Sequence, residues 1–116
     1  MSPGVAQLVT VAHGTRFGPG NEVARAITEG AGDLLGVPAV ASYVELCEPS
    51  FASVMAASRE PAVAVPLLLS AGHHLRHDLP AAVSGASAPV VLAPALGPPP
   101  LLAAAQAARL VAAGAR

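Results

Sequence analysis

Four aliphatic segments, each followed by a segment of helical character, constrain the fold of this chain more than any other feature. Strands are predicted at 7–12, 39–47, 62–70 and 89–96. They are almost continuously apolar and do not alternate, which is the pattern of a parallel sheet covered on both faces. Helices are predicted at 21–35, in a short segment from Pro49, at 79–84 and at 101–113. These repeats predict an α/β fold of three layers, in which helices flank both faces of a four-stranded parallel sheet.

The first predicted helix carries the clearest local signals. Apolar residues recur in it at helical spacing, namely Val23, Ile27, Ala31 and Leu34. Asn21 and Gly36 are typical residues for its N-terminal and C-terminal caps. Asp78, followed by Leu79 and a proline, is predicted to cap the third helix in the same way.

Composition predicts one domain over residues 1–116 and argues against several partners. The net charge is −1, with six arginines and seven acids, so no excess positive field favours nucleic acid or an acidic membrane. No apolar run reaches the roughly 20 residues of a membrane span, and Cys47 has no second cysteine to pair with, so a cytoplasmic location is expected. Charged residues make up only 11%, against about 25% in an average soluble domain, so some apolar surface is expected to meet another copy or lobe.

Polar side chains follow three of the predicted strands. His13 comes directly after the first, Glu45 lies near the end of the second, and the third runs into a segment with His73 and His74. In open parallel sheets ligands bind beyond the carboxyl ends of the strands. His13, Glu45 and His74 are therefore expected to meet at one edge, and a carboxylate in an apolar strand is expected to have a partner or a ligand there.

Plainer interpretations stand beside this one. A histidine at a strand end can simply bond a loop carbonyl, and a solvated polar loop is the favoured interpretation for His73 and His77. Cys47 is interpreted as core packing because no second thiol or adjacent cation is visible to activate it. A histidine phosphatase also has a strand ending in His-Gly, but with arginine ahead of the histidine, where this chain has Ala12. That hydrolase is the weaker alternative, since few cations are at hand to hold a phosphoryl group.

The motifs resemble those of the class II sirohydrochlorin chelatases, the cobalt- and iron-inserting enzymes of cobalamin and sirohaem synthesis. The matching positions are His13-Gly14-Thr15, Glu45 in "ELCEPS", and Gly72, His74, Asp78 and Pro80 of a GxHxxxDxP segment. They span nearly the whole chain in the family's order, and the last segment is the most specific. His73 is not implied by the resemblance, and His77 stands where the family often has an acid.

The resemblance implies that His13 and His74 bind the metal and accept protons, with Glu45 as their acidic companion. The divalent ion, Co²⁺ or Fe²⁺ with Ni²⁺ as a further candidate, is then a substrate, and no organic cofactor is expected. Candidate contacts for a carboxylate-rimmed tetrapyrrole are Thr15, Arg16, Ser70, Gly72 and Arg76. The resemblance also implies a homodimer, or a second lobe in a longer chain. A non-catalytic lobe that binds metal or tetrapyrrole is the alternative, and the residues choose neither the metal nor the pathway.

Overall fold

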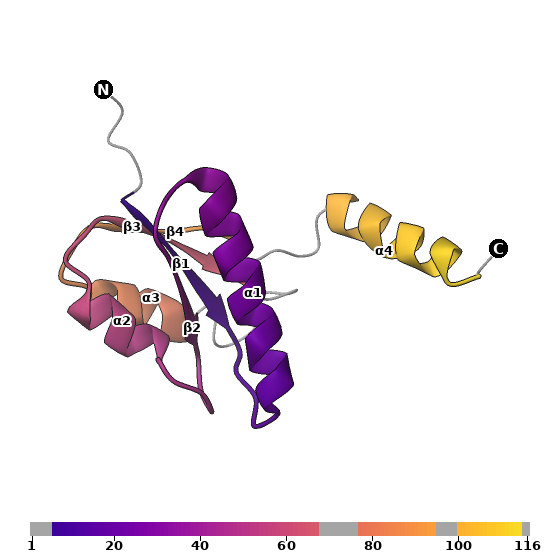
Figure 1. Cartoon of the computed structure of the whole chain (residues 1–116). Helices are drawn as coiled ribbons and strands as arrows, with labels where there is room; N and C mark the ends of the chain where they lie inside the picture. The colour runs from indigo at the N-terminus through magenta and orange to yellow at the C-terminus, as the bar shows by residue number, and fades with distance from the viewer. Residues whose placement is uncertain (1–5, 68–76, 95–99, 115–116) are drawn as a thin grey trace.

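The computed structural model describes residues 6–67, 77–94 and 100–114 (Figure 1). All paired strands are parallel and their spatial order is β2-β1-β3-β4, which confirms the predicted α/β class. The strands are β1 (Gln7–Ala12), β2 (Ala39–Tyr43), β3 (Ala62–Pro66) and β4 (Val90–Leu92). The helices are α1 (Gly18–Leu35), α2 (Phe51–Ala57), α3 (Leu79–Ser84) and α4 (Pro100–Ala112).

The strands β2, β3 and β4 are shorter than predicted, whereas β1 has the predicted bounds. β2 ends at Tyr43 because the chain bends over the next residues, where Leu46 adopts a left-handed φ of 65°. β4 ends at Leu92, and Pro94 has no backbone N–H with which to continue the ladder. The predicted ends of the third and fourth strands, at 68–70 and 95–96, lie outside the described residues.

Two helix starts also differ from prediction. α2 begins at Phe51 rather than in the turn of Pro49, because Ser50 is its cap and the hydroxyl oxygen of Ser50 accepts the N–H of Ser53 at 3.2 Å. α3 has its predicted bounds, but Asp78 makes no capping hydrogen bond and itself has helical φ and ψ. Asp78 therefore stands at the N-cap position as predicted, but its side chain does not cap the helix.

α1 begins three residues before the predicted Asn21 and packs a different face from the expected one. A proline occupies its first turn, where a missing N–H is tolerated, and Gly36 ends it in the left-handed conformation as predicted. The residues that α1 buries against β1 and β2 are small, namely Ala24, Thr28 and Gly32. Val23, Ile27 and Leu34, expected in the core, are 60%, 53% and 90% exposed.

Close packing explains that difference. A Cβ added to Gly32 would lie 2.6 Å from the Cβ of Ala39 on β2, so only glycine lets the helix approach the sheet this closely. The hydroxyl of Thr28 is hydrogen-bonded to that of Thr10 on β1, which satisfies two polar groups inside the layer. The face of α1 that packs on the sheet is therefore made of small side chains, and the larger aliphatic side chains beside them stay exposed.

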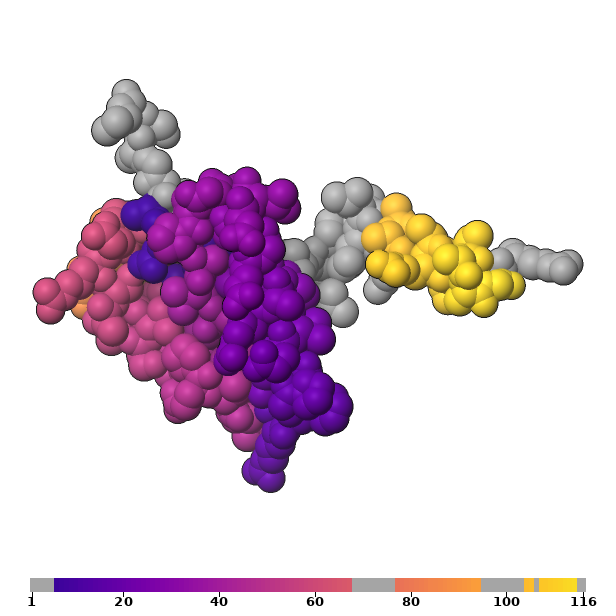
Figure 2. All heavy atoms as spheres, viewed as in Figure 1, coloured from indigo at the N-terminus to yellow at the C-terminus, as the bar shows by residue number. Residues whose placement is uncertain are grey.

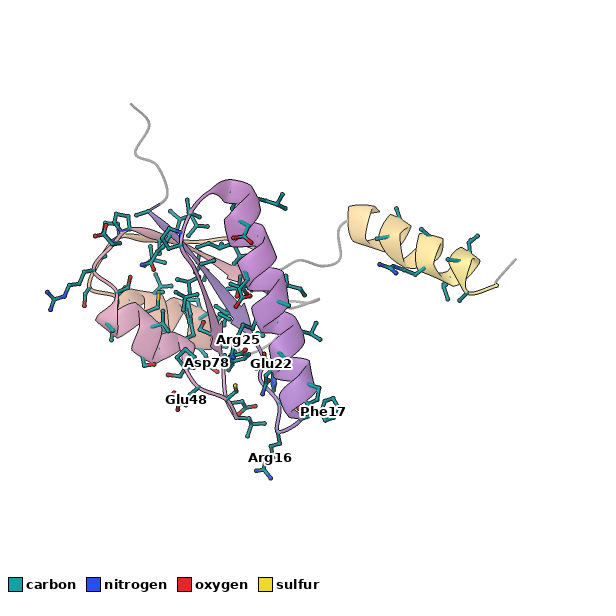
Figure 3. All side chains as sticks on the ribbon, viewed as in Figure 1. Arg16, Phe17, Glu22, Arg25, Glu48 and Asp78 are labelled. Carbon is teal, nitrogen blue, oxygen red and sulfur yellow. The ribbon has the colours of Figure 1, made fainter. Side chains whose placement is uncertain are left out.

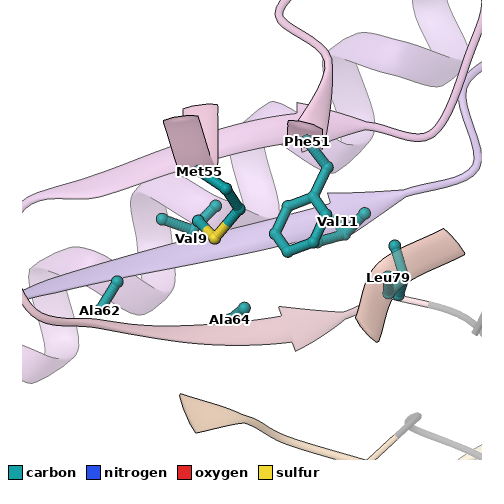
Figure 4. Close-up of a cluster of buried hydrophobic side chains, with 7 residues drawn as sticks. All are labelled: Val9, Val11, Phe51, Met55, Ala62, Ala64 and Leu79. Carbon is teal, nitrogen blue, oxygen red and sulfur yellow. The ribbon is translucent and has the colours of Figure 1, made fainter. Parts of the chain in front are cut away.

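The main core lies on the opposite face of the sheet, under α2 and α3. Figure 4 shows its seven buried side chains, Val9, Val11, Phe51, Met55, Ala62, Ala64 and Leu79. β1 and β3 contribute the sheet side of this core. Phe51 and Met55 of α2 and Leu79 of α3 pack against it. These contacts fix the two central strands, and the carboxyl end of β1 carries His13 of the candidate site.

α4 stands clear of the rest of the chain in Figures 1 and 2. α1 packs on one face of the sheet and α2 and α3 on the other, as the three-layer prediction requires. No helix within the described ranges combines the length and the apolarity that crossing a membrane requires.

Truncation of the buried Leu79 to alanine tests this account of the core. We expect Leu79→Ala to lower the free energy of unfolding by about 2–5 kcal/mol, because it leaves a cavity under α3. Leu46→Ala is the matched control: Leu46 is 52% exposed, and its truncation should change stability by less than about 0.5 kcal/mol. Urea unfolding followed by circular dichroism measures both, and equal losses would contradict the placement of Leu79.

Candidate functional site

The loops after β1 and β2 stay paired beyond the ends of the two strands. The N–H of Val44 donates to the carbonyl of Ala12 at 2.8 Å, and the N–H of Glu45 donates to the carbonyl of His13 at 3.1 Å. This extension of the ladder places His13 and Glu45 side by side at the carboxyl edge of the sheet. The structure thus brings together two residues that are 32 positions apart in sequence, as the predicted topology required.

The side chains of His13 and Glu45 form the centre of the described site. The Nε2 atom of His13 lies 3.4 Å from Oε1 of Glu45, and both side chains are about half exposed. The other ring nitrogen, Nδ1, lies 3.1 Å from the carbonyl oxygen of Gly14. A carbonyl only accepts hydrogen bonds, so this contact places the proton of a neutral ring on Nδ1 and turns the Nε2 lone pair toward the carboxylate. In this tautomer the Nε2 lone pair and the carboxylate oxygen face the same space, where both could bind one cation, whereas a protonated ring would pair with the carboxylate.

Gly14 makes the close approach of the two loops feasible. Its φ is 92°, and a Cβ at this position would lie 1.8 Å from the carbonyl oxygen of Glu45. A side chain here would meet both a strained backbone and a backbone clash. The glycine of the His-Gly-Thr motif thus has a structural reason that is independent of any ligand.

Asn21 and Tyr43 hold the loop that carries Thr15 and Arg16. The side-chain amide of Asn21 accepts the N–H of Thr15 at 3.1 Å and donates to its carbonyl at 2.8 Å. The hydroxyl of Tyr43 donates to the carbonyl of Asn21 at 2.9 Å, and burial raises the pKa of the Tyr43 phenol, which keeps it a donor. This support was not predicted from the sequence, in which Asn21 was interpreted as a helix cap and Tyr43 was given no role. The only signals were an amide in the first turn of α1 and a lone tyrosine at a strand end.

Thr15 and Arg16 both lie at the predicted edge. The hydroxyl oxygen of Thr15 accepts the N–H of Phe17 at 3.1 Å, and its own proton remains a donor. Arg16 is exposed, and Figure 3 shows its guanidinium projecting away from the body beside Phe17. This placement suits contact with an anionic group of a ligand above the edge.

The remaining predicted site residues, Ser70, Gly72, His74 and Arg76, lie outside the described residues, as does His73. The structure brings His13 and Glu45 together as expected, while their roles and the position of His74 stay predictions. His77 and Asp78 are exposed at the start of α3. Within 6–67, 77–94 and 100–114, no group of three or more His, Cys, Asp or Glu side chains is placed to hold a metal ion.

Cys47 lies in the bend after β2, and its predicted place in the core is wrong. Its side chain is partly exposed and donates to the carbonyl of Glu48 at 3.5 Å. The prediction failed because β2 ends at Tyr43, four residues earlier than expected. Cys47 thus borders the edge of the sheet instead of its interior.

Comparisons with known proteins extend these observations. The family model CbiX matches residues 7–113 of the chain. The chain is also similar to the crystal structure of a putative cobalamin (vitamin B12) biosynthesis CbiX protein from Marinobacter aquaeolei VT8. The two are 27% identical with a TM-score of 0.71, and the match covers 90% of this chain and 91% of that one. No curated protein matches the chain.

Adding a methyl group at Gly14 tests how the two loops are held together. We expect Gly14→Ala to destabilise the chain by more than about 1–2 kcal/mol, the strain of a left-handed backbone alone, because the Glu45 carbonyl must also move. Gly18→Ala is the control, since an added Cβ at Gly18 has no atom within 4 Å. Thermal unfolding compares the two variants, and a Gly14→Ala protein as stable as Gly18→Ala would refute the close approach.

Proposed function

Because the chain belongs to the CbiX family, whose model matches residues 7–113, we propose that it is a sirohydrochlorin chelatase. The family supports a metal chelatase of cobalamin biosynthesis that acts on a divalent ion. The finer proposal is that Co²⁺ or Fe²⁺ is inserted into a tetrapyrrole derived from precorrin-2, with cobalamin or sirohaem as the pathway. The similar Marinobacter protein, described as a putative cobalamin biosynthesis protein, supports the first of these pathways.

The separation of His13 Nε2 and Glu45 Oε1 is the observation that carries the proposal. Protein ligands of a first-row divalent ion such as zinc lie about 2.0–2.2 Å from the metal, so two of them at a tetrahedral angle are about 3.4 Å apart. The two atoms are 3.4 Å apart in this structure. An ion could therefore bind between them with little movement of either loop.

The chemistry of insertion explains why these residue types suit the task. A divalent ion replaces two pyrrole N–H protons, so the site must both present a metal and accept protons. Neutral imidazole is a borderline ligand that binds Co²⁺ and Fe²⁺, and its ordinary pKa of about 6.5 lets it take up a proton at cellular pH. The Gly14 carbonyl fixes the ring of His13 through Nδ1, as outer contacts do for metal-bound histidines.

A site with few protein ligands is suited to transfer of the ion. The proposed set is His13, Glu45 and His74, which leaves coordination positions open for the nitrogens of the macrocycle. A closed site of four ligands would hold the ion instead. Glu45 adds a negative charge that offsets that of the ion, and its half-exposed side chain is accessible to a ligand at the edge of the sheet.

The proposed substrate contacts include residues of the loop after β1. Arg16 and the Thr15 hydroxyl would meet carboxylates of the tetrapyrrole. Ser70, Gly72 and Arg76, which follow β3 in sequence, are proposed as further contacts. We infer that the chain is one lobe, residues 1–116, and that a second copy or a second lobe of a longer chain closes the cleft over the ring.

Replacement of each proposed histidine ligand tests the catalytic assignment. We expect His13→Ala and His74→Ala each to slow Co²⁺ insertion by about 10²–10⁴-fold, the usual contribution of a positioned acid–base group. The change in sirohydrochlorin absorbance measures the rate. His73→Ala and His77→Ala are the matched controls and should retain activity. Insertion that is unchanged in His74→Ala would remove His74 from the mechanism, and loss in all four variants would contradict the assigned pair.

Glu45→Gln separates the charge of Glu45 from its shape. The amide keeps the size of the side chain but cannot share a cation with His13 in the same way, so we expect Co²⁺ affinity to fall by at least about tenfold. Isothermal titration with Co²⁺ measures this affinity, and the insertion assay should show a parallel loss. Glu48→Gln, on the same loop but outside the proposed set, is the control. Equal Co²⁺ affinity in Glu45→Gln and the unaltered chain would overturn the assignment of Glu45.

A further inference from the structure

Arg16 lies between two peptide groups that are both held by hydrogen bonds. On its N-terminal side, the carbonyl of Thr15 accepts the side-chain amide of Asn21 at 2.8 Å, and the N–H of Thr15 donates to the same side chain at 3.1 Å. On its C-terminal side, the N–H of Phe17 donates to the hydroxyl of Thr15 at 3.1 Å. Peptide planes that are fixed on either side of a Cα atom leave φ and ψ of that residue little freedom. The direction in which the Arg16 side chain leaves the backbone is therefore set by its neighbours.

The side chain of Arg16 is accessible to a ligand. It is exposed, and Figure 3 shows it at the end of the loop, pointing away from the body. In the part of the chain that the structure describes, the arginine with an ion pair is Arg25, whose partner Glu22 lies 3.0 Å away, and Arg16 has none. A guanidinium on a fixed backbone, without a carboxylate partner among these residues, is suited to bind an anion.

Asn21 is itself held by β2. It lies in the first turn of α1, and its backbone carbonyl accepts the hydroxyl of Tyr43 at 2.9 Å. Tyr43 is fully buried, and its N–H donates to the carbonyl of Pro49 at 3.0 Å. A continuous chain of contacts thus runs from the buried end of β2, through Tyr43 and Asn21, to the backbone beside Arg16.

We propose that Asn21 is a positioning residue for the anionic ligand of the site, and that it acts through Arg16. By holding the loop, it presents the guanidinium to a carboxylate of the tetrapyrrole. This inference rests on the proposed function, because it takes the carboxylate-rimmed ring as the ligand. A loop that is ordered before binding loses only side-chain freedom when the ligand arrives, whereas a loose loop would lose backbone freedom as well. The order that Asn21 provides therefore raises the affinity for the ring.

A purely structural role for Asn21 predicts different results. Loss of an amide that only stabilises the chain would weaken the binding of the ring whether or not Arg16 is present, and it would also disturb the rest of the edge. His13 and Glu45 are held by backbone pairing that does not involve Asn21. A positioning role through Arg16 therefore predicts that the affinity for Co²⁺ is unchanged.

Titration of sirohydrochlorin into the chain without added metal, followed by absorbance, tests the proposal. We expect Asn21→Ala to raise the Kd about tenfold, because the loop must then be ordered by the ligand. Tyr43→Phe keeps the buried ring but releases the Asn21 carbonyl, and it should raise the Kd by a smaller factor. Gln7→Ala is the matched control, since Gln7 is an amide that binds the carbonyl of Glu60 at 3.2 Å at the opposite end of β1. Equal Kd values in Asn21→Ala and Gln7→Ala would overturn the proposal.

A double-mutant cycle shows whether Asn21 acts through Arg16. Arg16→Ala should itself raise the Kd about tenfold, and the addition of Asn21→Ala should then change the Kd by less than about twofold. Isothermal titration with Co²⁺ should give the same affinity for Asn21→Ala and the unaltered chain. An equal further loss in the double variant, or a parallel loss of Co²⁺ affinity, would indicate a general structural role and would refute the positioning role. An Arg16→Ala chain that binds the ring as tightly as the unaltered chain would refute it as well.

These results separate the positioning role from the proposed reaction. A chain that binds sirohydrochlorin with the expected dependence on Asn21, but inserts no Co²⁺, would support the positioning role and refute the reaction. A chain that inserts Co²⁺ and binds the ring equally well with and without Asn21→Ala would refute the positioning role alone. A chain that does not bind the ring would contradict both.

Discussion

The backbone pairing that continues past the ends of β1 and β2 is the contact on which the candidate site depends. It places the Glu45 N–H on the His13 carbonyl and thereby sets the separation of the two side chains. The pairing needs a glycine at Gly14, since any Cβ there would occupy the position of the Glu45 carbonyl. A main-chain constraint thus positions the two side chains of the candidate site, and their geometry does not require the contacts of a bound ligand to hold it.

Secondary structure could be predicted from the sequence where the local signal agrees with the packing. β1 and α3 have the predicted bounds, and Gly36 ends α1 as expected, because strand pattern and cap chemistry act within a few residues. The buried face of α1 was predicted wrongly, because large aliphatic residues and small residues recur at helical spacing on adjacent faces of the helix, and the small ones are buried. Gly32 and Thr28 are buried through their fit to Ala39 and Thr10 across the layer, and this fit cannot be read from the helix alone.

The same distinction, between what local sequence and topology predict and what depends on contacts between elements, applies to the candidate site. Topology alone was enough to bring His13 and Glu45 together, since the carboxyl ends of adjacent parallel strands meet at one edge. The clamp of Asn21 and Tyr43 on Thr15 was missed because it consists of hydrogen bonds among three separate elements, none of which has a sequence pattern. Such a clamp restrains the loop between β1 and α1, and with it the direction in which Arg16 projects.

The two faces of the sheet and the candidate site are linked through the central strands. β3 has one surface in the core under α2 and α3, while Val63 and Val65 on its other surface are only partly buried, and its carboxyl end leads into the segment with Gly72 and His74. A strand covered on one side only gains less from burial than one covered on both, and its end is correspondingly easier to displace. Packing of further side chains against Val63 and Val65 would therefore restrain the strand that leads to the predicted second histidine ligand. Order at the candidate site is in this way expected to depend on how fully both surfaces of β3 are covered.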